Sequence, residues 1–400
     1  MSIAAFRIRL ASLGLLFALS LLAGSGAAAT DPAAPRKVIV DDDITGVRSS
    51  ALLAIQAPGV QVLGLTIVSG SVWRDEGVAH ALRMLEIAGR PDIPVVPGAT
   101  FPLVNTEQAT RRWEALYGKL VYKGAWMDRK WPDGTLQSQP LYHAPDHVPD
   151  LPEGNPTIRA SAEIAANFLI RTVREFPGQV TIIATGPLTN LALAQRLDPQ
   201  FAANAKELVI MGGSLNPQRK LASQSAQQFG REYLNTPRLE FNFRWDPEAA
   251  SIALRAPWRR IVMVPADPST ATELTPELLN AMTRATTPLA QSLKRFSETG
   301  FPMWDEIAAA VWLNPSLITT ADDLAVDVDM SFTAGYGNTL SWPKGEGPGL
   351  GERPVTVVRE IDVTGTERLM IELMNRTTPP STPPSTPQPT PQPTPRSAPR

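Results

Sequence analysis

Short runs of apolar residues recur along the chain, and most of them end in a cluster of small or polar residues. A continuous apolar run of about four to eight residues bounded by turn-forming residues is typical of a strand that is buried on both faces. The pattern predicts such strands at Lys37–Val40, Val60–Ser69, Val180–Ala184, Leu208–Met211 and Ile261–Val264, with a further strand at Val355–Val358.

Segments with a helical spacing of apolar positions lie between these strands. We expect helices at Ala51–Gln56, at Val78–Ile87, at Ile158–Phe176 and at Pro247–Leu254, and a short helix near Trp113–Leu120. Strands that alternate with helices, each strand being one apolar run, favour a mostly parallel sheet covered on both faces. The expected fold class is α/β, a mostly parallel open sheet with helices on both faces.

The polar clusters of the chain follow the predicted strands directly. They are Asp41–Asp43, Gly70-Ser71, Thr185–Asn190 and Gly212-Gly213. In open α/β sheets, ligands bind outside the carboxyl ends of the strands, where neighbouring connections diverge to opposite faces. The sequence therefore predicts one ligand site, assembled along that edge of the sheet.

The two ends of the chain differ from its centre. Arg7 and Arg9 precede an apolar run and then a small-residue stretch, which predicts a signal peptide at residues 1–29 and an exported protein, periplasmic or secreted. An uncleaved membrane anchor is the alternative, but the run is shorter than the roughly 20 residues that a spanning helix needs. Residues 377–400 are nearly all Pro, Thr, Ser and Gln, which predicts a disordered tail. Residues 36–376 are interpreted as one domain.

Composition excludes several classes of function. The chain has no cysteine, so disulfides and thiolate metal sites are excluded. The formal net charge is −2 and no basic stripe is present, so neither nucleic acid nor a membrane is an expected partner of the mature protein. A small molecule is the expected ligand.

The acidic triplet carries the chemistry that we expect. Side chains alternate along a strand, so Asp41 and Asp43 should share a face while Asp42 points to the other. Two carboxylates that share a site need either a proton or a hard cation such as Ca²⁺, which binds through oxygen. The same stretch matches the Asp-x-Asp-x-Thr motif of haloacid-dehalogenase-type phosphatases, but the second acidic pair that such enzymes need lacks a good candidate at a late strand end.

Five segments in order, between about Lys37 and Leu317, resemble the inosine-uridine-preferring nucleoside hydrolase family. They are Val40–Ile44, Thr66–Ser71, Ala184–Asn190, Val209–Gly213 and the pair Glu240–Asn242 with Asp246–Ala250. The resemblance implies the nucleoside-hydrolase fold, a Rossmann-like sheet, and cleavage of the N-glycosidic bond of ribonucleosides or related N-ribosides with a calcium-assisted water. It leaves self-association into a homo-oligomer open.

The resemblance also implies roles for individual residues. Asp43 would be a Ca²⁺ ligand and the base that activates water, with Asp41 as a supporting carboxylate. Thr185 would bind the metal through its backbone carbonyl, and Asp305 through its carboxylate. The substrate would contact Glu240 and Asn242 through its ribose hydroxyls, while Met211 would line the ribose pocket.

Several positions depart from the family pattern. Ser49 and Ser50 stand where two adjacent aspartates are usual, with Ser50 at the metal position and Ser49 at the ribose position. Neutral hydroxyls should lower the affinity for a cation. Trp304 stands where a histidine often assists the departing base, and its indole offers a stacking face but no acid. Ser71 replaces a frequent asparagine.

These departures support two hypotheses. The first is an active nucleoside hydrolase, and the second is a pseudo-enzyme of the same fold that binds a nucleoside or sugar without cleaving it. The long aromatic-rich connection Phe101–Pro156 is interpreted as an ordered rim or lid, with a packed insertion as the alternative. Within it, His143 and His147 are candidate proton donors, whereas His80 is expected to be structural.

Overall fold

The computed structural model describes residues 34–127, 142–216, 227, 235 and 238–380. The predicted signal peptide and residues 381–400 of the predicted tail lie outside this part of the chain, as does the segment around Trp131 of the long connection. Residues 377–380 are described and belong to no helix or strand.

The strands of the described residues form one mixed sheet in the order β3-β2-β1-β4-β5-β6-β9-β7-β8. The sheet is parallel from β3 to β9, while β7 runs antiparallel to both β9 and β8. The strands are β1 (Arg36–Asp42), β2 (Val60–Ile67), β3 (Val95–Pro97), β4 (Val180–Ala184), β5 (Glu207–Met211), β6 (Ile261–Val264), β7 (Ile318–Val328), β8 (Thr339–Pro343) and β9 (Arg353–Ile361). The α/β class and the mostly parallel sheet are confirmed.

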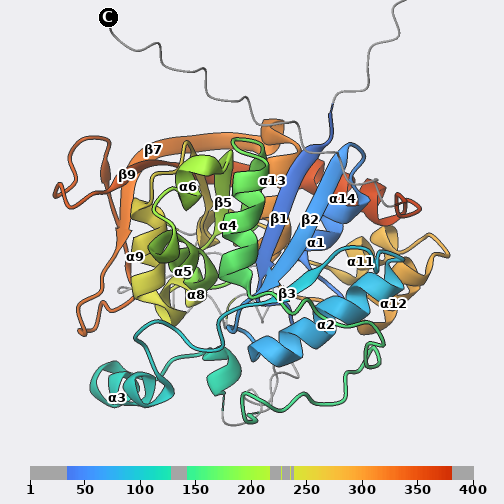
Figure 1. Ribbon diagram of the computed structural model, residues 1–400, viewed down its shortest axis with the longest axis horizontal. Helices are drawn as coiled ribbons and strands as arrows, with labels where there is room; N and C mark the ends of the chain where they lie inside the picture. Colours follow the sequence, from blue (N-terminus) through green and yellow to red (C-terminus); the bar gives the residue numbers. More distant parts are fainter. Residues whose placement is uncertain (1–33, 128–141, 217–226, 228–234, 236–237, 381–400) are drawn as a thin grey trace, which may run out of the picture. The chain divides into compact units, whose positions relative to one another are not determined.

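Helices lie on both faces of this sheet (Figure 1). In the first half they are α1 (Ser50–Gln56), α2 (Arg74–Ile87), α3 (Glu107–Tyr117), η1 (Gly124–Trp126), α4 (Ala165–Glu175), α5 (Thr189–Leu197) and α6 (Phe201–Asn204). In the second half they are α8 (Phe241–Trp245), α9 (Pro247–Arg255), α10 (Ala266–Ser269), α11 (Pro276–Met282), α12 (Pro288–Phe296), α13 (Asp305–Leu313), η2 (Pro315–Leu317) and α14 (Val363–Met374).

Two apolar cores, one on each face, follow from the alternation along the strands. In β1, Val38 and Val40 pack into the core that contains α1, α2 and α13, whereas Ile39 packs into the core under α4, α5 and α9. A strand covered on both sides must be apolar at every position, which explains the continuous apolar run. Helix α4 begins at Ala165, seven residues later than the sequence predicted. Residues 158–164 form no regular helix.

Strand β1 lies at the point where the chain reverses its direction across the sheet. The chain passes from β1 to β2 on one side, and later returns to place β4 on the other side of β1. The crevice outside the carboxyl end of such a strand is the usual ligand position in open α/β sheets. Asp42 is the last residue of β1, so the acidic triplet lies at that crevice.

In the described part of the chain, no helix is long and apolar enough to cross a membrane.

Gly124 holds the long connection against the strand-end loop after β2. Its φ is +52°, and a Cβ atom there would lie 2.1 Å from the carbonyl oxygen of Gly70. We expect Gly124→Ala to lower the free energy of unfolding by about 2–4 kcal/mol through steric overlap and backbone strain. Urea denaturation would measure this loss. Gly59→Ala is the control, because Gly59 also has a positive φ, +70°, but has open space around its Cβ position. A loss no larger than that of the control would contradict the expectation.

Candidate active site

A cavity of about 660 Å³ lies at the carboxyl ends of β1, β4 and β5. Every site residue that the sequence predicted lines this cavity, with the exception of Asp41. The predicted residues that line the cavity are Asp43, Ser49, Ser50, Ser71, Thr185, Met211, Glu240, Asn242, Trp304 and Asp305. The fold therefore brings together strand-end residues such as Asp43 and Thr185 with Asp305 of α13, which is more than 250 positions from Asp43 in the chain.

The structure corrects the expected division of the acidic triplet. Asp42 lines the cavity and Asp41 does not. Asp41 is fully buried on the α5 side of the sheet, where its Oδ2 accepts hydrogen bonds from Thr66 Oγ1 at 2.5 Å and Asn190 Nδ2 at 2.8 Å. Alternation does separate Asp41 from Asp42, but β1 ends at Asp42, so Asp43 no longer follows the pleat. Asp43 and Asp42 share the cavity instead.

This position of Asp41 also contradicts the phosphatase alternative. In that alternative Asp41 would be the nucleophile, yet both hydrogen bonds of its Oδ2 come from neighbouring elements of the fold and its Oδ1 is buried without a hydrogen-bond partner. Burial raises the pKa of Asp41 to about 7. In this position the Asp41 carboxyl group bonds to Thr66 and Asn190 and does not face the cavity.

Asp43 is held by the loop that follows β2. The backbone N–H of Ser71 donates a hydrogen bond to Asp43 Oδ2 at 2.7 Å. Burial, and next the charge of Asp42, raise the pKa of Asp43 to about 7. A Cβ atom on Gly70 would lie 2.3 Å from Asp43 Oδ2, so the absence of a side chain at Gly70 allows this close approach.

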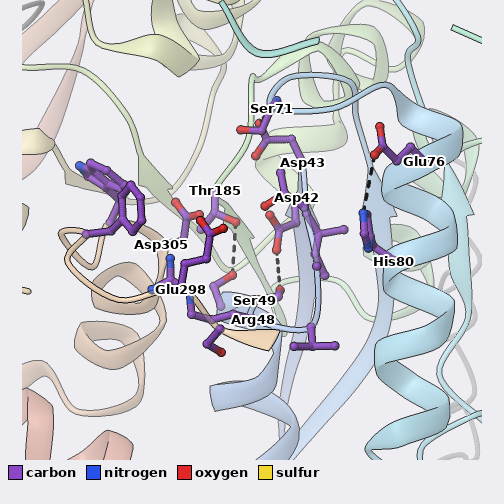
Figure 2. Close-up of a pocket in the computed structure, with 18 of the residues that line it drawn as sticks. Asp42, Asp43, Arg48, Ser49, Ser71, Glu76, His80, Thr185, Glu298 and Asp305 are labelled. Atoms are coloured by element: carbon purple, nitrogen blue, oxygen red, sulfur yellow. Dashed lines mark hydrogen bonds and ion pairs between the residues drawn. The ribbon is translucent and has the colours of Figure 1, made fainter. Parts of the chain in front are cut away.

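Asp305 faces the triplet from the first turn of α13. Burial and the charges of Asp42, Glu306 and Asp43 raise the pKa of Asp305 well above its usual range. Arg48 Nε forms an ion pair with Glu306 Oε1 at 3.3 Å, and its charge offsets part of this effect. Figure 2 shows Asp42, Asp43, Thr185 and Asp305 converging in the pocket.

Ser49 and Ser50 have structural partners in addition to their place in the cavity. Ser49 Oγ donates to Asp42 Oδ2 at 2.6 Å and accepts from the backbone N–H of Ala51, so it is the N-cap of α1. Ser50 Oγ lies 3.2 Å from Thr185 Oγ1. The hydrogen bond from Ser49 links the start of α1 to Asp42, a residue whose role the sequence reasoning missed.

A second polar group of the cavity lies at the start of α8. Glu240 is the N-cap of α8, and its carboxylate accepts from the backbone N–H groups of Asn242, Phe243 and Gly213. Asn242 Nδ2 donates to the backbone carbonyls of Thr185 at 2.9 Å and of Met211 at 3.1 Å. These bonds fix Glu240 and Asn242 against the ends of β4 and β5.

Aromatic side chains form much of the remaining lining. Trp304 precedes α13 and lies beside the cavity together with Tyr122 and Phe241. The rings of Tyr122 and Phe241 have centroids 4.7 Å apart. Tyr122 hydrogen-bonds with the Ser71 side chain, and burial raises the pKa of its phenol. Within the long connection, Tyr122 and residues 149–153 are rim residues, whereas Trp113 and Trp126 pack away from the cavity.

The donor set fits a hard divalent cation. Three carboxylates, the buried Asp42 and Asp43 and the half-buried Asp305, line one cavity and interact unfavourably with one another. Oxygen ligands of this kind suit calcium. Among the described residues, no group of three or more His, Cys, Asp or Glu side chains is arranged so that it could hold a metal ion by itself, so a cation here would also need other oxygen ligands. Thr185 and Ser50 line the same cavity and carry further oxygen atoms, of which the Thr185 carbonyl already accepts a hydrogen bond from Asn242.

A cluster of two histidines and two glutamates lies along the side of the cavity formed by α2, and the sequence singled out only its histidines. His80 Nδ1 contacts Glu153 Oε1 at 2.5 Å, and its Nε2 lies 3.8 Å from Glu76 Oε1. His143 Nε2 contacts Glu76 Oε2 at 2.9 Å. The i,i+4 spacing of Glu76 and His80, just after Ser71, was the signal that could have identified this cluster.

The three histidines therefore differ in position. His80 and His143 line the cavity, whereas His147 does not. The Nδ1 atom of His143 contacts the carbonyl of Ala144 at 2.8 Å, so both ring nitrogens of His143 have protein partners. The proposal that His143 or His147 donates a proton to the substrate finds no support in these contacts.

The partners of His80 predict a pH-dependent contribution to stability. Hydrogen bonds and charges of Glu153 and Glu76 outweigh burial and raise the pKa of His80 from 6.5 to about 9. The stabilisation is fully present below pH 6.5 and is lost as the pH rises through 9. One pKa unit corresponds to about 1.4 kcal/mol, so the loss is on the order of 3 kcal/mol.

Urea denaturation of the wild type and of His80→Gln between pH 6 and 10 would measure this contribution. The variant should be less stable at pH 6 and should show a flatter profile. His147→Gln is the control, since His147 is exposed and does not line the cavity, although its ring lies 5.4 Å from that of His143. Parallel profiles for wild type and His80→Gln would contradict the assignment of a charged His80.

The chain is similar to known proteins over much of its length. The family model described as inosine-uridine preferring nucleoside hydrolase matches residues 38–368. A protein of Schizosaccharomyces pombe is 31% identical over 336 residues, which cover 80% of this chain and 79% of that protein. Uridine nucleosidase 1 of Arabidopsis thaliana is 35% identical over 218 residues, 54% of this chain and 52% of the plant protein. This match spans about half the length of the plant protein.

Solved structures show the same fold. A plant nucleoside hydrolase is similar with a TM-score of 0.63 and 25% identity, covering 86% of this chain and 100% of that chain. A structure described as an inosine-guanosine nucleoside hydrolase has a TM-score of 0.63 at 21% identity and covers 85% of this chain and 98% of its own.

Proposed function

The chain belongs to the inosine-uridine preferring nucleoside hydrolase family, and from this premise we propose that its cavity cleaves the N-glycosidic bond of ribonucleosides with water. One observation carries the proposal. Two buried carboxylates, Asp42 and Asp43, meet the half-buried Asp305 in one cavity, together with the Glu240 and Asn242 pair and an aromatic lining. A carboxylate group suited to activating water, a polar group suited to ribose hydroxyls and flat faces suited to a base are the three parts that the reaction needs.

Each group of residues in the cavity has its own role in the proposed hydrolysis. The reaction breaks the bond between C1′ of ribose and the ring nitrogen of the base, through a transition state with oxocarbenium character. Asp43 accepts the proton of the attacking water. Asn242 and Glu240 contact ribose hydroxyls, and Met211 lies against the sugar. Trp304 and Tyr122 offer ring faces to the base, and contact with these faces excludes bulk water from it.

Calcium is the cation that we propose for the carboxylate cluster. Asp42, Asp43 and Asp305 would hold it through their carboxylates, with further oxygens from Thr185 and Ser50. When bound, the ion lowers the pKa of water and neutralises the repulsion among the carboxylates. Asp42 is an addition to the ligands expected from the sequence, and it compensates for part of the charge that Ser49 and Ser50 lack.

A pseudo-enzyme that binds without cleaving is the second candidate, and the neutral hydroxyls of Ser49 and Ser50 favour it. Against it, Asp42 and Asp43 supply two carboxylates on the side of the cavity where those serines lie. The hydrolase is therefore the better supported function.

The proposal is tested by incubating the purified full-length protein with calcium and uridine, inosine or cytidine, and measuring free base by chromatography. We expect release of base from at least one of these nucleosides. Tight binding of a nucleoside, measured by calorimetry, without release of base would favour the pseudo-enzyme and overturn the hydrolase.

We also propose that the protein acts after export, in a periplasm or outside the cell. The basic residues Arg7 and Arg9 followed by the apolar run and small residues of the N-terminal segment support this. Fractionation of cells that express the full chain, with N-terminal sequencing of the product, would test it. Self-association into a homo-oligomer is a further proposal, for which light scattering is the test.

A further inference from the structure

The side of the cavity formed by α2 carries negative charge that the carboxylate cluster does not explain. Glu76 and Glu153 lie on two sides of His80, so two carboxylates surround one imidazolium. All three side chains are buried, and all three line the cavity. The hydrogen bonds and charges of His80 and His143 outweigh burial and lower the pKa of Glu76, so it is ionised at neutral pH. Figure 2 shows the pair on α2, to one side of the carboxylate cluster.

Tyr122 interacts both with the α2 side of the cavity and with the carboxylate cluster. Its phenol interacts electrostatically with Asp43, Glu76 and Asp305, and it hydrogen-bonds with the side chain of Ser71. Tyr122, Glu76, Asp43 and Asp305 all line the same cavity. A base attached to a ribose at that cluster would extend along the face of Tyr122 towards Glu76. An aromatic face next to a carboxylate is a combination that favours a positively charged ring.

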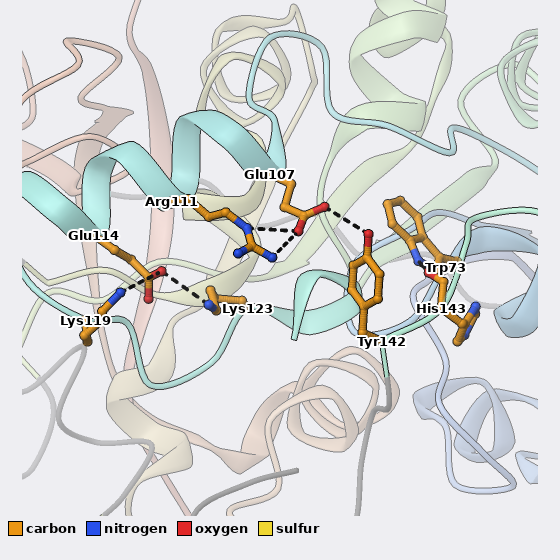
Figure 3. Close-up of polar contacts among 8 residues, drawn as sticks. All are labelled: Trp73, Glu107, Arg111, Glu114, Lys119, Lys123, Tyr142 and His143. Atoms are coloured by element: carbon orange, nitrogen blue, oxygen red, sulfur yellow. Dashed lines mark hydrogen bonds and ion pairs between the residues drawn. The ribbon is translucent and has the colours of Figure 1, made fainter. Parts of the chain in front are cut away.

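The segment that contains His143, Glu153 and Thr157 forms the rest of this side of the cavity. Hydrogen bonds attach it to α2 and to Trp73, the residue just before α2. Trp73 Nε1 donates to the carbonyl of His143 at 2.9 Å, as Figure 3 shows. Arg83 Nε donates to the carbonyl of Glu153 at 3.0 Å, and Glu86 accepts from the backbone N–H and the hydroxyl of Thr157, both at 2.6 Å. These bonds keep the charged wall in one arrangement before any ligand binds.

The proton-bearing groups of this wall already have partners. His80 uses both ring nitrogens on Glu153 and Glu76, and His143 uses both on Glu76 and Ala144. The indole of Trp304 is no general acid. A neutral base that leaves with the electron pair of the glycosidic bond becomes an anion and must be protonated. A base that is already cationic leaves as a neutral molecule and needs no proton.

From these observations we propose that the preferred substrates are ribosides of positively charged nitrogen heterocycles, in which ribose is attached to a quaternary ring nitrogen. The inference deepens the proposed function and rests on it. The C1′–N bond breaks and its electron pair goes to the ring nitrogen, which removes the positive charge. Water forms the new C1′–O bond, and its proton goes to Asp43. Glu76 stabilises the cationic substrate through its charge, and the faces of Tyr122 and Trp304 contact the ring.

Steady-state hydrolysis of nicotinamide riboside and of uridine, with calcium present, tests the inference. We expect the wild type to show at least about a tenfold higher kcat/KM for nicotinamide riboside, the size of one screened charge interaction. Glu76→Gln should lower that value about tenfold more than it lowers kcat/KM for uridine, mainly through KM, because any effect of the lost contacts with His80 and His143 acts on both substrates. Glu76→Asp keeps the charge and should retain most of the preference.

The matched control is Glu114→Gln. Glu114 is also a buried carboxylate with cationic partners, Lys119 and Lys123, but it does not line the cavity (Figure 3). The control should change neither substrate's kcat/KM. It separates the loss of a charge at the wall from the general effect of neutralising a buried glutamate.

A second measurement separates binding from the intrinsic lability of cationic ribosides and needs no variant. 1-Methylnicotinamide, a cation because its ring nitrogen is methylated, should bind the wild type at least about tenfold more tightly than neutral nicotinamide by calorimetry. Equal binding of the two, or an equal effect of Glu76→Gln on both ribosides, overturns the inference and leaves nucleoside hydrolysis standing. Hydrolysis of neither riboside overturns the proposed function as well.

Discussion

Replacing Asp43 by asparagine is expected to lower kcat/KM for base release by at least about a thousandfold. Asparagine keeps the size of the side chain and can still accept the hydrogen bond from the backbone of Ser71, but it cannot accept the proton of the attacking water. The same change removes one carboxylate from the cation site. Kinetics with the best substrate of the wild type, at saturating calcium, would measure the loss.

Asp327→Asn is the matched control for this experiment. Asp327 is also buried and forms an ion pair with Arg255, but it lies on β7 outside the cavity. It should lower the free energy of unfolding while leaving kcat/KM per folded molecule within about twofold. A similar loss of activity in both variants would mean that the effect of Asp43→Asn comes from the fold rather than from the chemistry.

The second large effect is expected on calcium binding in Asp42→Asn. Ligand binding stabilises a folded protein by about 2.7 kcal/mol when the ligand is at a hundred times its Kd. In the wild type, calcium should therefore raise the thermal midpoint in a concentration-dependent way. In Asp42→Asn the calcium titration should shift by about tenfold or more to higher concentration, because the number of charged oxygens sets the affinity.

Differential scanning calorimetry across a calcium series, after removal of metal with a chelator, would measure both proteins. Without calcium, Asp42→Asn should be no less stable than the wild type, since the change relieves repulsion with Asp43 and Asp305. If Asp42→Asn keeps the wild-type calcium titration and Asp41→Asn loses it, the assignment of Asp42 to the cavity is wrong.

The strand ends illustrate how much of the site the sequence could predict. Parallel strands must bring their carboxyl ends to one edge, so Asp43, Thr185 and Met211 could be grouped from local patterns alone. Asp305 and Asn242 were found only through the resemblance, because neither follows a strand directly. Their positions depend on how α8 and α13 pack, which local hydrophobic patterns do not encode.

The misassignment of Asp41 and Asp42 has a physical reason. Alternation separates the two residues, but it does not state which face of the sheet holds the cavity, nor where the strand ends. The cavity lies on the face of Val40, under α1 and α13, and β1 ends one residue before Asp43. Both facts depend on helices that come later in the chain.

The antiparallel strands β7 and β8 and the charged wall were also beyond local patterns. Strand β7 contains the exposed stretch Thr319–Asp323, whose polar residues show no continuous apolar run. The contact of His80 with Glu153 joins residues 73 positions apart. A helix with a polar stripe at Glu76 and His80 can face solvent or another segment, and only the packed structure distinguishes the two.

The most direct test of the central claim is one assay of stoichiometry with uridine and the wild-type protein, with and without a calcium chelator. The account predicts that ribose and uracil appear in equal amounts with calcium, that both cease when the ion is removed, and that both return when it is restored. Release that does not respond to calcium would contradict the cation site, and bound uridine without any free ribose would contradict hydrolysis.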